Sequence, residues 1–501
     1  MKIKFNSLSD WKTDKPRTKA SSEVFPLFIL LTQETWKRSH PALPLSSELQ
    51  SRIENAKSRL KSPLKAGERL WIPGSEPKQE DLWIGLLPEE KETFFLLEFA
   101  RDSLKQIIQP QDRKLGCLIL ESEHCEPLAD ALGAALWIRI HPLATYGLRA
   151  KTDKPFAFEE LHWITPSGKP SSTLQKSLIS AQGSHLARSL ATLPPNLLNA
   201  QHYGEQIQSL AKKHRLGFRF YSNSKLKKMG AGAFTAVDQG DPDSAGGIYE
   251  LTYSPQGVKA SKVIHLAGKG LCFDTGGYDI KIQGGMHTMK GDMQGSAVAL
   301  ATLIAASQLK LPYRMKAFLA VTENHLSPKA YKADDVVIAL NQMSIEVVNT
   351  DAEGRMVLAD TLTLASQEQP DCLIDFATLT GSAIRSLGTK YSAGFTNQEA
   401  WHERIRAAGV SSGERVWTFP MDSTYAKALE SKVADTLQCV KGPGPDHIHA
   451  AYFLSRFIQK KTPWVHIDLC AAENEGGIGH VDSLFTGFGV RWALEFIKHA
   501  F

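Results

Sequence analysis

Four carboxylates and three basic side chains gather in two short stretches of the sequence, residues 269–292 and residues 349–355. They are Lys269, Asp274, Lys281, Asp292, Asp351, Glu353 and Arg355. Carboxylates that meet in one place would be protonated unless cations of comparable charge lie among them. Two divalent metal ions would supply that charge, and nearly all the candidate ligands are oxygen donors, with no HExxH or Cys-His spacing. Zinc, manganese and magnesium all fit, and paired metal ions of this kind are typical of hydrolases.

Each part of this pattern also has a simpler interpretation. The stretch NTDAEGR at 349–355 could be a surface turn, because Asn, Asp and Gly favour turns, and the pattern alone leaves a turn and a site equally open. Taken singly, Asp274 and Asp292 would more often cap helices or lie in turns, and Lys269 would more often be a solvated lysine. The elements that position these side chains must therefore decide.

Short apolar runs of strand length alternate with helical stretches in the second half of the chain. The runs are VIHLA (263–267), AFLAV (317–321), EVV (346–348), CLIDFA (372–377) and WVHIDL (464–469). This alternation predicts a mostly parallel sheet with helices on both faces. Ligands bind beyond the carboxyl ends of the strands in such a sheet, so we expect the charged residues that follow the runs to meet at one edge.

The clearest break in composition is TPSGKPSST at 165–173, which is rich in turn-forming residues and lacks large apolar side chains. We therefore expect two α/β domains, each a mixed, mostly parallel sheet flanked by helices. The expected parts are an N-terminal domain for assembly or regulation at 1–164, a linker and connecting helix at 165–193, and a larger catalytic domain at 194–501.

Composition and charge exclude several classes of protein. The chain of 501 residues has a formal net charge of only +5, far from the dense basic face that generic nucleic-acid binding requires. Its six cysteines form neither CxxC pairs nor a secreted framework, which favours a reduced compartment. The apolar run FPLFILL at 25–31 is too short and too late for a signal peptide, and no segment approaches the roughly 20 apolar residues of a membrane helix. We expect a cytoplasmic protein that does not enter a membrane.

The motifs around the charged residues closely resemble those of the leucyl aminopeptidase family of cytosolic metallopeptidases. They are GKGLCFDTGG (268–277), IK (280–281), MKGDM (289–293), NTDAEGRMVLAD (349–360) and DFATLTGSA (375–383), and NTDAEGR matches the signature of that family without change. The resemblance runs from about residue 185 to the C-terminus. It implies a dinuclear-metal aminopeptidase that releases N-terminal residues, preferably leucine-like ones, from short peptides by attack of a metal-activated water.

The resemblance also implies a ligand for each metal ion. A tighter ion would be held by Lys269, Asp274, Asp292 and Glu353. A more exchangeable ion would be held by Asp274, Asp351 and Glu353, together with the backbone carbonyl of Asp351. Asp274 and Glu353 would bridge the two ions. A metal-bound lysine must be neutral, so burial and the neighbouring cation would have to lower the pKa of Lys269.

The remaining roles that the resemblance implies concern the substrate. Lys281 would contact the substrate carbonyl, where an ammonium stabilises charge that grows only in the transition state. Arg355 would hold a bicarbonate that acts as general base, because its planar guanidinium matches that anion. Met289, Thr378 and Gly381 would line the pocket for the first side chain, although a lone methionine more often fills a gap in a core. A free substrate amine on the tighter ion would explain specificity for N-termini.

A few positions depart from the family pattern. Asp279 and Ile282 replace the usual serine and proline beside Lys281, and Asp279 could alter the pKa of that lysine. GPGPDHIH at 442–449 replaces a glycine-alanine stretch, and we expect an exposed loop there that changes substrate access. Histidines inside the strand runs, such as His466, are expected to be hydrogen-bonded core residues rather than ligands.

Other functions remain open beside the leading one. The resemblance implies a homohexamer whose active sites face an interior cavity. A dipeptidase such as a Cys-Gly hydrolase is the nearest alternative enzyme. DNA binding is an alternative of another class, because at least one bacterial member of the family binds DNA. The basic cluster KTDKPRTK at 12–19 could contribute to a groove on a hexamer, although such charge runs are usually solvated. An inactive scaffold would have lost a ligand, and all seven charged positions are present.

Overall fold

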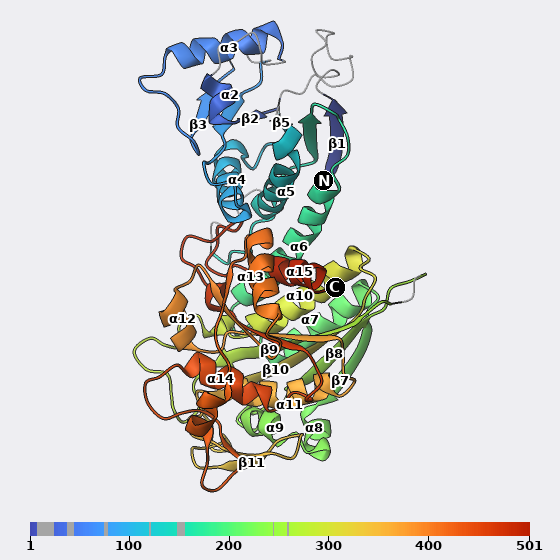
Figure 1. Cartoon of the computed structure of the whole chain (residues 1–501), viewed down its shortest axis with the longest axis vertical. Coiled ribbons are helices and arrows are strands. Elements are labelled where there is room, and N and C mark those ends of the chain that lie inside the picture. The colour runs from blue at the N-terminus through green and yellow to red at the C-terminus, as the bar shows by residue number, and fades with distance from the viewer. Residues whose placement is uncertain are drawn as a thin grey trace. The chain divides into compact units, whose positions relative to one another are not determined.

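A computed structural model describes the chain at residues 1–7, 25–37, 45–74, 79–119, 122–147, 156–243, 245–257 and 260–501. By its packing the chain divides into two compact units (Figure 1). The N-terminal unit comprises Met1–Ala181 with Gly479–Val481, and the C-terminal unit comprises Gln182–Ile478 with Asp482–Phe501. Helix α6, Ser172–Thr192, contributes residues to both units.

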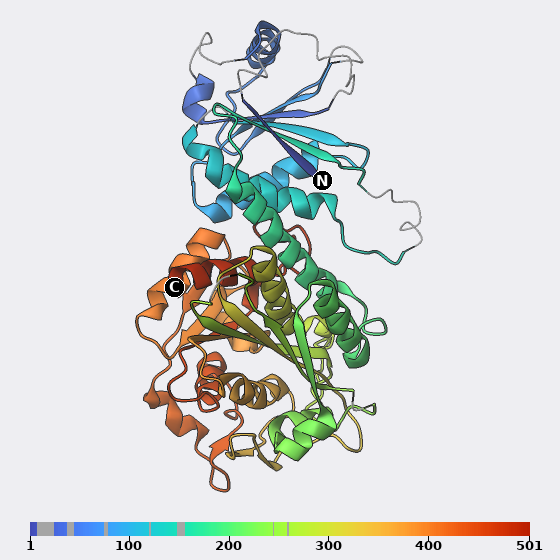
Figure 2. The same cartoon turned by 90° about the vertical axis from the view of Figure 1, so that its right-hand side faces the viewer.

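The N-terminal unit is built on a six-stranded sheet in the order β1-β6-β5-β2-β4-β3, in which only the β3–β4 pair is antiparallel. Its strands are β1 (Lys2–Ser7), β2 (Leu27–Leu31), β3 (Arg69–Ile72), β4 (Leu82–Leu86), β5 (Lys114–Ile119) and β6 (Glu160–Thr165). Its helices are α2 (Gln33–Lys37), α3 (Ser47–Ser58), α4 (Thr93–Ile107) and α5 (Cys125–Ile140). Alternate residues of β2 pack in two separate hydrophobic clusters, Leu30 with residues of α4 and α5, and Ile29 with residues of α2 and α3. The sheet therefore lies between two helical layers (Figure 2).

The C-terminal unit has an eight-stranded sheet in the order β15-β14-β17-β13-β9-β10-β8-β7. Its strands are β7 (Gly217–Ser222), β8 (Gly247–Tyr253), β9 (Val263–Asp274), β10 (Arg314–Asn324), β13 (Cys372–Ala377), β14 (Ser392–Thr396), β15 (Val416–Thr418) and β17 (Trp464–Asp468). The four central strands, β17, β13, β9 and β10, are parallel to one another. The predicted class, α/β with mostly parallel sheets flanked by helices, is confirmed.

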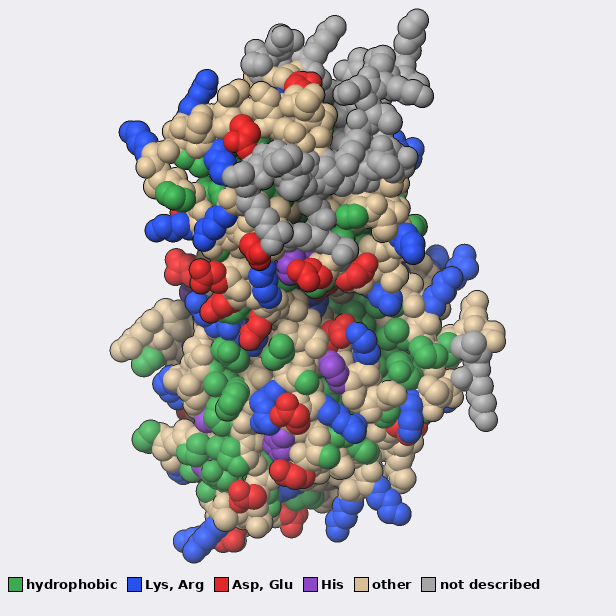
Figure 3. Space-filling model, turned by 45° about the horizontal axis from the view of Figure 1, so that its top comes forward, with side chains coloured by type: hydrophobic (Ala, Val, Ile, Leu, Met, Phe, Trp, Pro, Cys, Tyr) green, Lys and Arg blue, Asp and Glu red, His purple; other side chains and the backbone are tan. Residues whose placement is uncertain are grey.

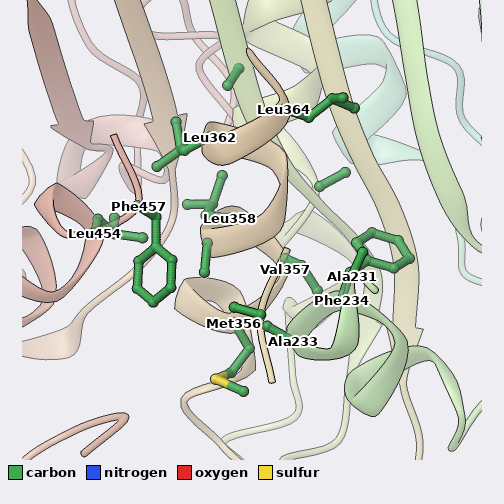
Figure 4. Close-up of a cluster of buried hydrophobic side chains, with 14 of the residues drawn as sticks. Ala231, Ala233, Phe234, Met356, Val357, Leu358, Leu362, Leu364, Leu454 and Phe457 are labelled. Atoms are coloured by element: carbon green, nitrogen blue, oxygen red, sulfur yellow. The ribbon is translucent and has the colours of Figure 1, made fainter. Parts of the chain in front are cut away.

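Helices cover both faces of this sheet. They are α7 (Ala200–Lys213), α8 (Asn223–Met229), α9 (Gly232–Asp238), α10 (Gln294–Gln308), α11 (Glu353–Ser366), α12 (Gly381–Leu387), α13 (Trp401–Ser412), α14 (Asp446–Ser455) and α15 (Val490–Ala500). The alternation of side chains along β9 assigns α10 and α11 to opposite faces. Ala267 and Leu271 belong to the cluster that α11 and α9 share (Figure 4), whereas a Cβ on Gly268 would meet the backbone of Gly295 on α10.

The prediction of a strand at EVV (346–348) in the main sheet was wrong in its bounds and in its sheet, because Val347 and Val348 follow the strand. The strand is β12, Ser344–Glu346, and it pairs with β11 (Val336–Ile338) and β16 (Thr436–Leu437) in a separate three-stranded sheet. A run of three residues with two valines can indicate a strand but carries no information about its partner, because pairing depends on distant segments. The segment NTDAEGR therefore connects a small sheet to helix α11.

The sequence analysis expected no membrane-spanning helix and only weak support for a basic surface that binds DNA. The described part of the chain has no helix that is long and apolar enough to cross a membrane. On the face that Figure 3 shows, Lys and Arg side chains are interspersed with Asp and Glu side chains, with no continuous basic area among the described residues. The cluster KTDKPRTK at 12–19 lies outside the described residues, so the DNA groove stays a prediction.

Helix α11 is tied to its neighbours by a buried acid, and this predicts a pH-dependent stability. Asp360 accepts hydrogen bonds from the backbone N–H of Phe234 at 2.8 Å and of Leu340 at 2.7 Å. Burial raises its pKa from 3.8 to about 7, although the backbone hydrogen bonds act to lower it. Because the folded state favours the protonated acid, stability from this group is present below about pH 4 and is lost as the pH rises through about 7.

We expect the free energy of unfolding of the native protein to fall, relative to that of an Asp360→Asn variant, by on the order of 4 kcal/mol as the pH rises through this range. The amide of the variant does not titrate, so it serves as the reference at each pH. Urea unfolding of both proteins at about pH 4 and about pH 8 measures the difference. Parallel pH dependences for the two proteins would contradict the assignment.

Candidate functional site

All ten residues that the sequence singled out line one cavity of about 520 Å³. They are the seven charged residues from Lys269 to Arg355 and the pocket residues Met289, Thr378 and Gly381. The cavity lies at the edge where the parallel strands end, because Asp274 is the last residue of β9, Thr378 follows β13 and Asp468 ends β17. The edge predicted from strand order is therefore where these side chains meet.

Lys269 lies among carboxylates inside the fold. Its side chain points from β9 toward the start of α11, and the residue is only 3% exposed. Its Nζ is 2.8 Å from Oδ1 of Asp292 and 2.9 Å from Oε1 of Glu353, and it donates to the backbone oxygen of Thr378 at 3.0 Å. Thr378 also donates through its hydroxyl to Asp292 at 2.8 Å. One lysine thus organises two acids from two different segments.

Lys281 lies among the remaining acids. Its Nζ is 2.8 Å from Oδ2 of Asp274 and 2.6 Å from Oδ1 of Asp351. Burial alone lowers the pKa of Lys281, but the charges of Asp274 and Glu353 outweigh burial and raise it. Lys281 is partly accessible from the cavity, with 17% of its side chain exposed. A cation that reaches a cavity in this way can meet a ligand oxygen.

The segment NTDAEGR is both a turn and a wall of the cavity. The N–H of Ala352 donates to the carbonyl of Asn349 at 3.1 Å, and the N–H of Asp351 donates to the Asn349 side chain at 2.7 Å. Helix α11 begins immediately afterwards at Glu353. A turn and a functional site were the two interpretations of this segment, and both apply, because the turn directs Asp351 and Glu353 into the cavity.

Thr350 joins this turn to two other segments. Its carbonyl accepts hydrogen bonds from the Asn324 amide at 3.1 Å and from the Tyr331 hydroxyl at 2.8 Å. Its hydroxyl donates to the carbonyl of Gly276 at 2.6 Å, and its N–H donates to Asp279 at 2.7 Å. Asn324 also donates to Oδ1 of Asp274 at 2.8 Å. The loop after β9 and the turn before α11 are thereby fixed to each other.

The acids of the cavity suit a divalent metal ion. Ligand atoms of Asp274, Asp351 and Glu353 all lie within 4.8 Å of one another. Oδ2 of Asp292 and Oε2 of Glu353 are buried and accept no hydrogen bond. Burial and the charge of Asp274 raise the pKa of Glu353 to about 8, and burial raises that of Asp292 to about 6. A metal cation would accept electron pairs from these oxygens, and its charge would lower the pKa of the carboxyl groups that burial raises.

The pKa of Lys269 is subject to opposing effects. Burial lowers the pKa of Lys269, as a neutral metal ligand would need. The charges of Asp292, Glu353 and Asp274 outweigh burial and raise this pKa. Lys269 is therefore an ammonium as long as the carboxylates are its only charged neighbours. It could become a neutral ligand only beside a cation that takes over those carboxylates.

Arg355 contacts a residue that the sequence analysis did not single out. Its Nη2 donates to Oδ2 of Asp446 at 2.7 Å, and its Nη1 donates to the carbonyl of Gln438 at 3.4 Å. Asp446 belongs to the stretch 442–449, which was recognised as a departure and interpreted only as a loop that changes access. Its contact with Arg355 spans 91 residues of sequence, so no local pattern could have indicated it.

The expectation of an exposed loop over the whole of 442–449 was wrong, and with it the exposure of the two histidines in that stretch. His447 and His449 are 5% and 7% exposed and lie in helix α14. The Pro and Gly residues form a turn only as far as Pro445, and the apolar residues that follow make a buried helix. The core histidine was predicted correctly, because Nδ1 of His466 is 2.6 Å from Asp375 inside the sheet.

Asp279 contacts the turn before α11 rather than Lys281. Its carboxylate accepts the N–H of Thr350 at 2.7 Å, and its own N–H donates to the Thr350 hydroxyl at 2.8 Å. The departure from the family pattern at this position therefore acts on the backbone that carries Asp351.

One further group among the described residues brings possible ligands together, and the sequence analysis missed it. It consists of Asp241, Glu323 and His325. Nε2 of His325 is 2.5 Å from Glu323, and this hydrogen bond raises the pKa of the histidine. A protonated imidazole offers no lone pair to a metal ion, so we interpret the contact as an ion pair.

Comparison with known proteins gives consistent matches. A model of the cytosol aminopeptidase family, catalytic domain, matches residues 185–494. A probable cytosol aminopeptidase of Chlorobaculum tepidum is 38% identical over 353 residues, 70% of this chain and 69% of the relative. One from Prochlorococcus marinus is 30% identical over 476 residues, 91% of this chain and 95% of the relative.

Solved structures resemble this chain over most of its length. The bottromycin maturation enzyme BotP in complex with Mn superimposes with a TM-score of 0.79 at 28% identity, covering 95% of this chain and 99% of that one. A mutant of tomato leucine aminopeptidase superimposes with a TM-score of 0.83 at 23% identity, covering 99% and 96%, and shows likeness of fold.

Gly354 is required by the approach of α11 to Lys269. A Cβ at this position would lie 2.7 Å from both Cε and Nζ of Lys269. We expect Gly354→Ala to lower the free energy of unfolding by about 1–3 kcal/mol, because overpacking outweighs the gain of about 1 kcal/mol that alanine brings to a helix. Urea unfolding measures the change. Gly147→Ala, where a Cβ meets open space, is the control, and a Gly354→Ala variant as stable as this control would contradict the contact.

Proposed function

Because this chain belongs to the cytosol aminopeptidase family, we propose that its cavity is the active site of a dinuclear-metal aminopeptidase. The chain is a metallo-aminopeptidase, a hydrolase of peptide bonds, by its family. The observation that carries the dinuclear site is the set of buried carboxylate oxygens without a hydrogen-bond donor, Oδ2 of Asp292 and Oε2 of Glu353, beside the carboxylates of Asp274 and Asp351.

The proposed ligands fall into two overlapping sets. Lys269, Asp274, Asp292 and Glu353 would hold one ion, and Asp274, Asp351 and Glu353 would hold the other. The contacts of Lys269 with Asp292 and Glu353 support the first set, and the 4.8 Å grouping supports the second. Manganese or zinc suits these donors, with magnesium also possible. When bound, such a pair lowers the pKa of a shared water and polarises a carbonyl.

Lys281 is proposed to stabilise the transition state. Its ammonium reaches the cavity and retains its charge because neighbouring acids raise its pKa. A cation at the oxygen of the scissile carbonyl interacts most strongly when that oxygen becomes negative, which lowers the barrier rather than only tightening binding. The same side chain also holds Asp274 and Asp351 in place.

Arg355 is proposed to hold the anion that accepts a proton from water, for which the family resemblance implies bicarbonate. The guanidinium is buried and lines the cavity, and its Nε–H has no hydrogen-bond acceptor. A planar anion can take two parallel hydrogen bonds from such a group.

A medium apolar residue such as leucine is the proposed first residue of the substrate. The apolar residues that line the cavity together with Thr378 and Gly381 are Met289, Leu379, Ile384, Leu469, Cys470 and Ala472. Apolar walls of this size favour a side chain that fills them and exclude water.

The assembly and the cellular location of this protein are further proposals, and both rest on the family resemblance. A homohexamer in the cytoplasm, with residues 1–164 serving assembly or regulation and residues 194–501 catalysis, is what the family resemblance implies. In such a hexamer the active sites would face an interior cavity, and only short peptides would reach them.

The dinuclear site is tested by metal titration. We expect metal-stripped protein to gain hydrolysis of leucine p-nitroanilide when manganese or zinc is added. Glu353→Ala should lose both metal binding and activity, because it removes a shared ligand. Lys281→Ala should retain metal but lose turnover by about a hundredfold to a thousandfold. Metal content by mass spectrometry and kcat are the measurements.

Lys432→Ala, which changes an exposed lysine of the same unit, is the matched control and should retain both metal and activity. Activity of Glu353→Ala equal to that of the native protein, or full turnover by Lys281→Ala, would refute the assigned roles.

Specificity for N-termini gives a separate prediction. We expect Leu-Gly-Gly to be cleaved after leucine and its N-acetylated form to be left intact, because acetylation removes the amine that the site is proposed to bind. Mass spectrometry of the products follows both reactions. Comparison of kcat/KM for Leu-Gly, Cys-Gly and the tripeptide separates an aminopeptidase from a dipeptidase, and cleavage of the acetylated peptide would contradict binding through the amine.

A further inference from the structure

One edge of the Arg355 guanidinium faces the carboxylate of Asp446. Nη2 of Arg355 donates to Oδ2 of Asp446 at 2.7 Å. The two atoms beside this contact, Nε of Arg355 and Oδ1 of Asp446, are both buried and have no hydrogen-bond partner. Nε and Nη2 lie on the same edge of the planar guanidinium, so they form the donor pair that a carboxylate or a carbonate takes up side by side. An acid of the chain itself thus holds one donor of this edge and lies beside the other, where a planar anion would have to bind.

The position of Asp446 is fixed by its neighbours in the chain. It is the first residue of α14, after a turn that contains Pro443 and Pro445. The next residue, His447, donates its backbone N–H to the Ser382 hydroxyl at 2.8 Å, and its Nδ1 lies 3.0 Å from the same oxygen. Proline restricts the backbone before the helix, and His447 anchors the first turn of the helix to α12. The carboxylate is therefore held in place rather than free to leave.

Arg355 is held equally firmly from the other side. Its Nη1 donates to the backbone carbonyl of Gln438 at 3.4 Å. The side chain of Gln438 accepts the N–H groups of Val348 and Asn349 at 3.0 Å and donates to the carbonyl of Ala352 at 3.1 Å. Gln438 thus ties Arg355 to the backbone of the turn that carries Asp351 and Glu353.

The two charges of the pair neutralise each other, with the guanidinium buried and the carboxylate partly exposed. Arg355 is 2% exposed, and the Asp446 side chain is 38% exposed. Burial raises the pKa of Asp446, but the adjacent guanidinium outweighs burial and holds that pKa below its ordinary value. A second anion on the same edge would have to displace a fixed carboxylate or lie beside it, and like charges at such short range repel.

We infer that Asp446 is the built-in anion partner of Arg355 and takes the place of bicarbonate in this chain. Asp446 is then a positioning residue, which acts through Arg355 by neutralising and orienting the guanidinium at the wall of the cavity. The inference rests on the proposed peptidase function and alters one part of it. No external anion would be needed at Arg355, and the proton of the attacking water would pass to a carboxylate of the chain itself.

The test uses the full-length, metal-loaded protein in buffer freed of carbon dioxide. We expect native protein to hydrolyse leucine p-nitroanilide at a rate that added bicarbonate changes by less than about twofold. For Asp446→Ala, we expect kcat in the same buffer to fall by about tenfold to a hundredfold, since positioning is lost, and bicarbonate to restore most of it. Asp446→Asn keeps the shape of the side chain without its charge and should also become responsive to bicarbonate.

Binding provides a readout that does not depend on turnover. Equilibrium dialysis with carbon-14 bicarbonate should detect no stoichiometric binding by the native protein and about one ion per subunit for Asp446→Ala, with the Arg355 edge vacated. Glu399→Ala, which changes an acid whose side chain is 99% exposed, is the matched control and should behave as the native protein in both measurements.

Stoichiometric bicarbonate binding by the native protein, or its stimulation by bicarbonate, would overturn the inference whether or not a variant folds. Folded Asp446 variants that neither bind bicarbonate nor recover with it would overturn it too, since the acid would then be a structural partner only. Absence of peptidase activity from every protein in every buffer would instead refute the proposed function, and the dialysis would still decide the question of the anion.

Discussion

The structure depends on placing four carboxylates together in a buried cavity. Burial and the charges of neighbouring acids raise the pKa of such groups, as at Glu353, and each lost hydrogen bond to water must be replaced. Two lysines provide the replacement from opposite sides, Lys269 toward Asp292 and Glu353, and Lys281 toward Asp274 and Asp351. Burial of these acids lowers the stability of the fold, and the same acids are suited to bind divalent cations. One cluster of residues therefore affects both the stability and the chemistry of the protein.

The framework around the cluster consists of elements with little freedom. Parallel strands bring Asp274 and Thr378 to one edge, and α11 starts at Glu353 so that its first turn faces Lys269. Glycine at 354 lets the helix approach the lysine side chain. The buried acid of Asp360, two turns further along α11, ties the helix to the backbone of its neighbours. Lys269 and Glu353 are therefore carried by a strand and a helix, whereas Lys281 and Asp351 lie in the loop and the turn that these elements hold between them.

The sequence predicted most of the fold and the residues of the cavity, for identifiable reasons. Long apolar runs such as those of β9, β10 and β13 reveal strands, and their order implies the edge at which charges meet. Pairings over long sequence separations could not be predicted in the same way. The sheet to which β12 belongs depends on β11 and β16, and the contact between Arg355 and Asp446 depends on where α14 begins. His447 and His449 were misjudged because glycine and proline mark a turn but not its end.

The hydrogen bonds at Thr350 include a contact outside the family pattern. Thr350 contacts no proposed ligand of the site through its side chain, yet it joins the loop that follows Asp274 to the backbone that carries Asp351. Asp279 is the partner of Thr350 in that loop, so this pair helps to set how the segments that carry the two acids approach each other. Position 350 keeps the threonine of the signature, whereas position 279 departs from the usual serine, so the carboxylate that accepts the Thr350 N–H is a contact that this chain has beyond the family pattern.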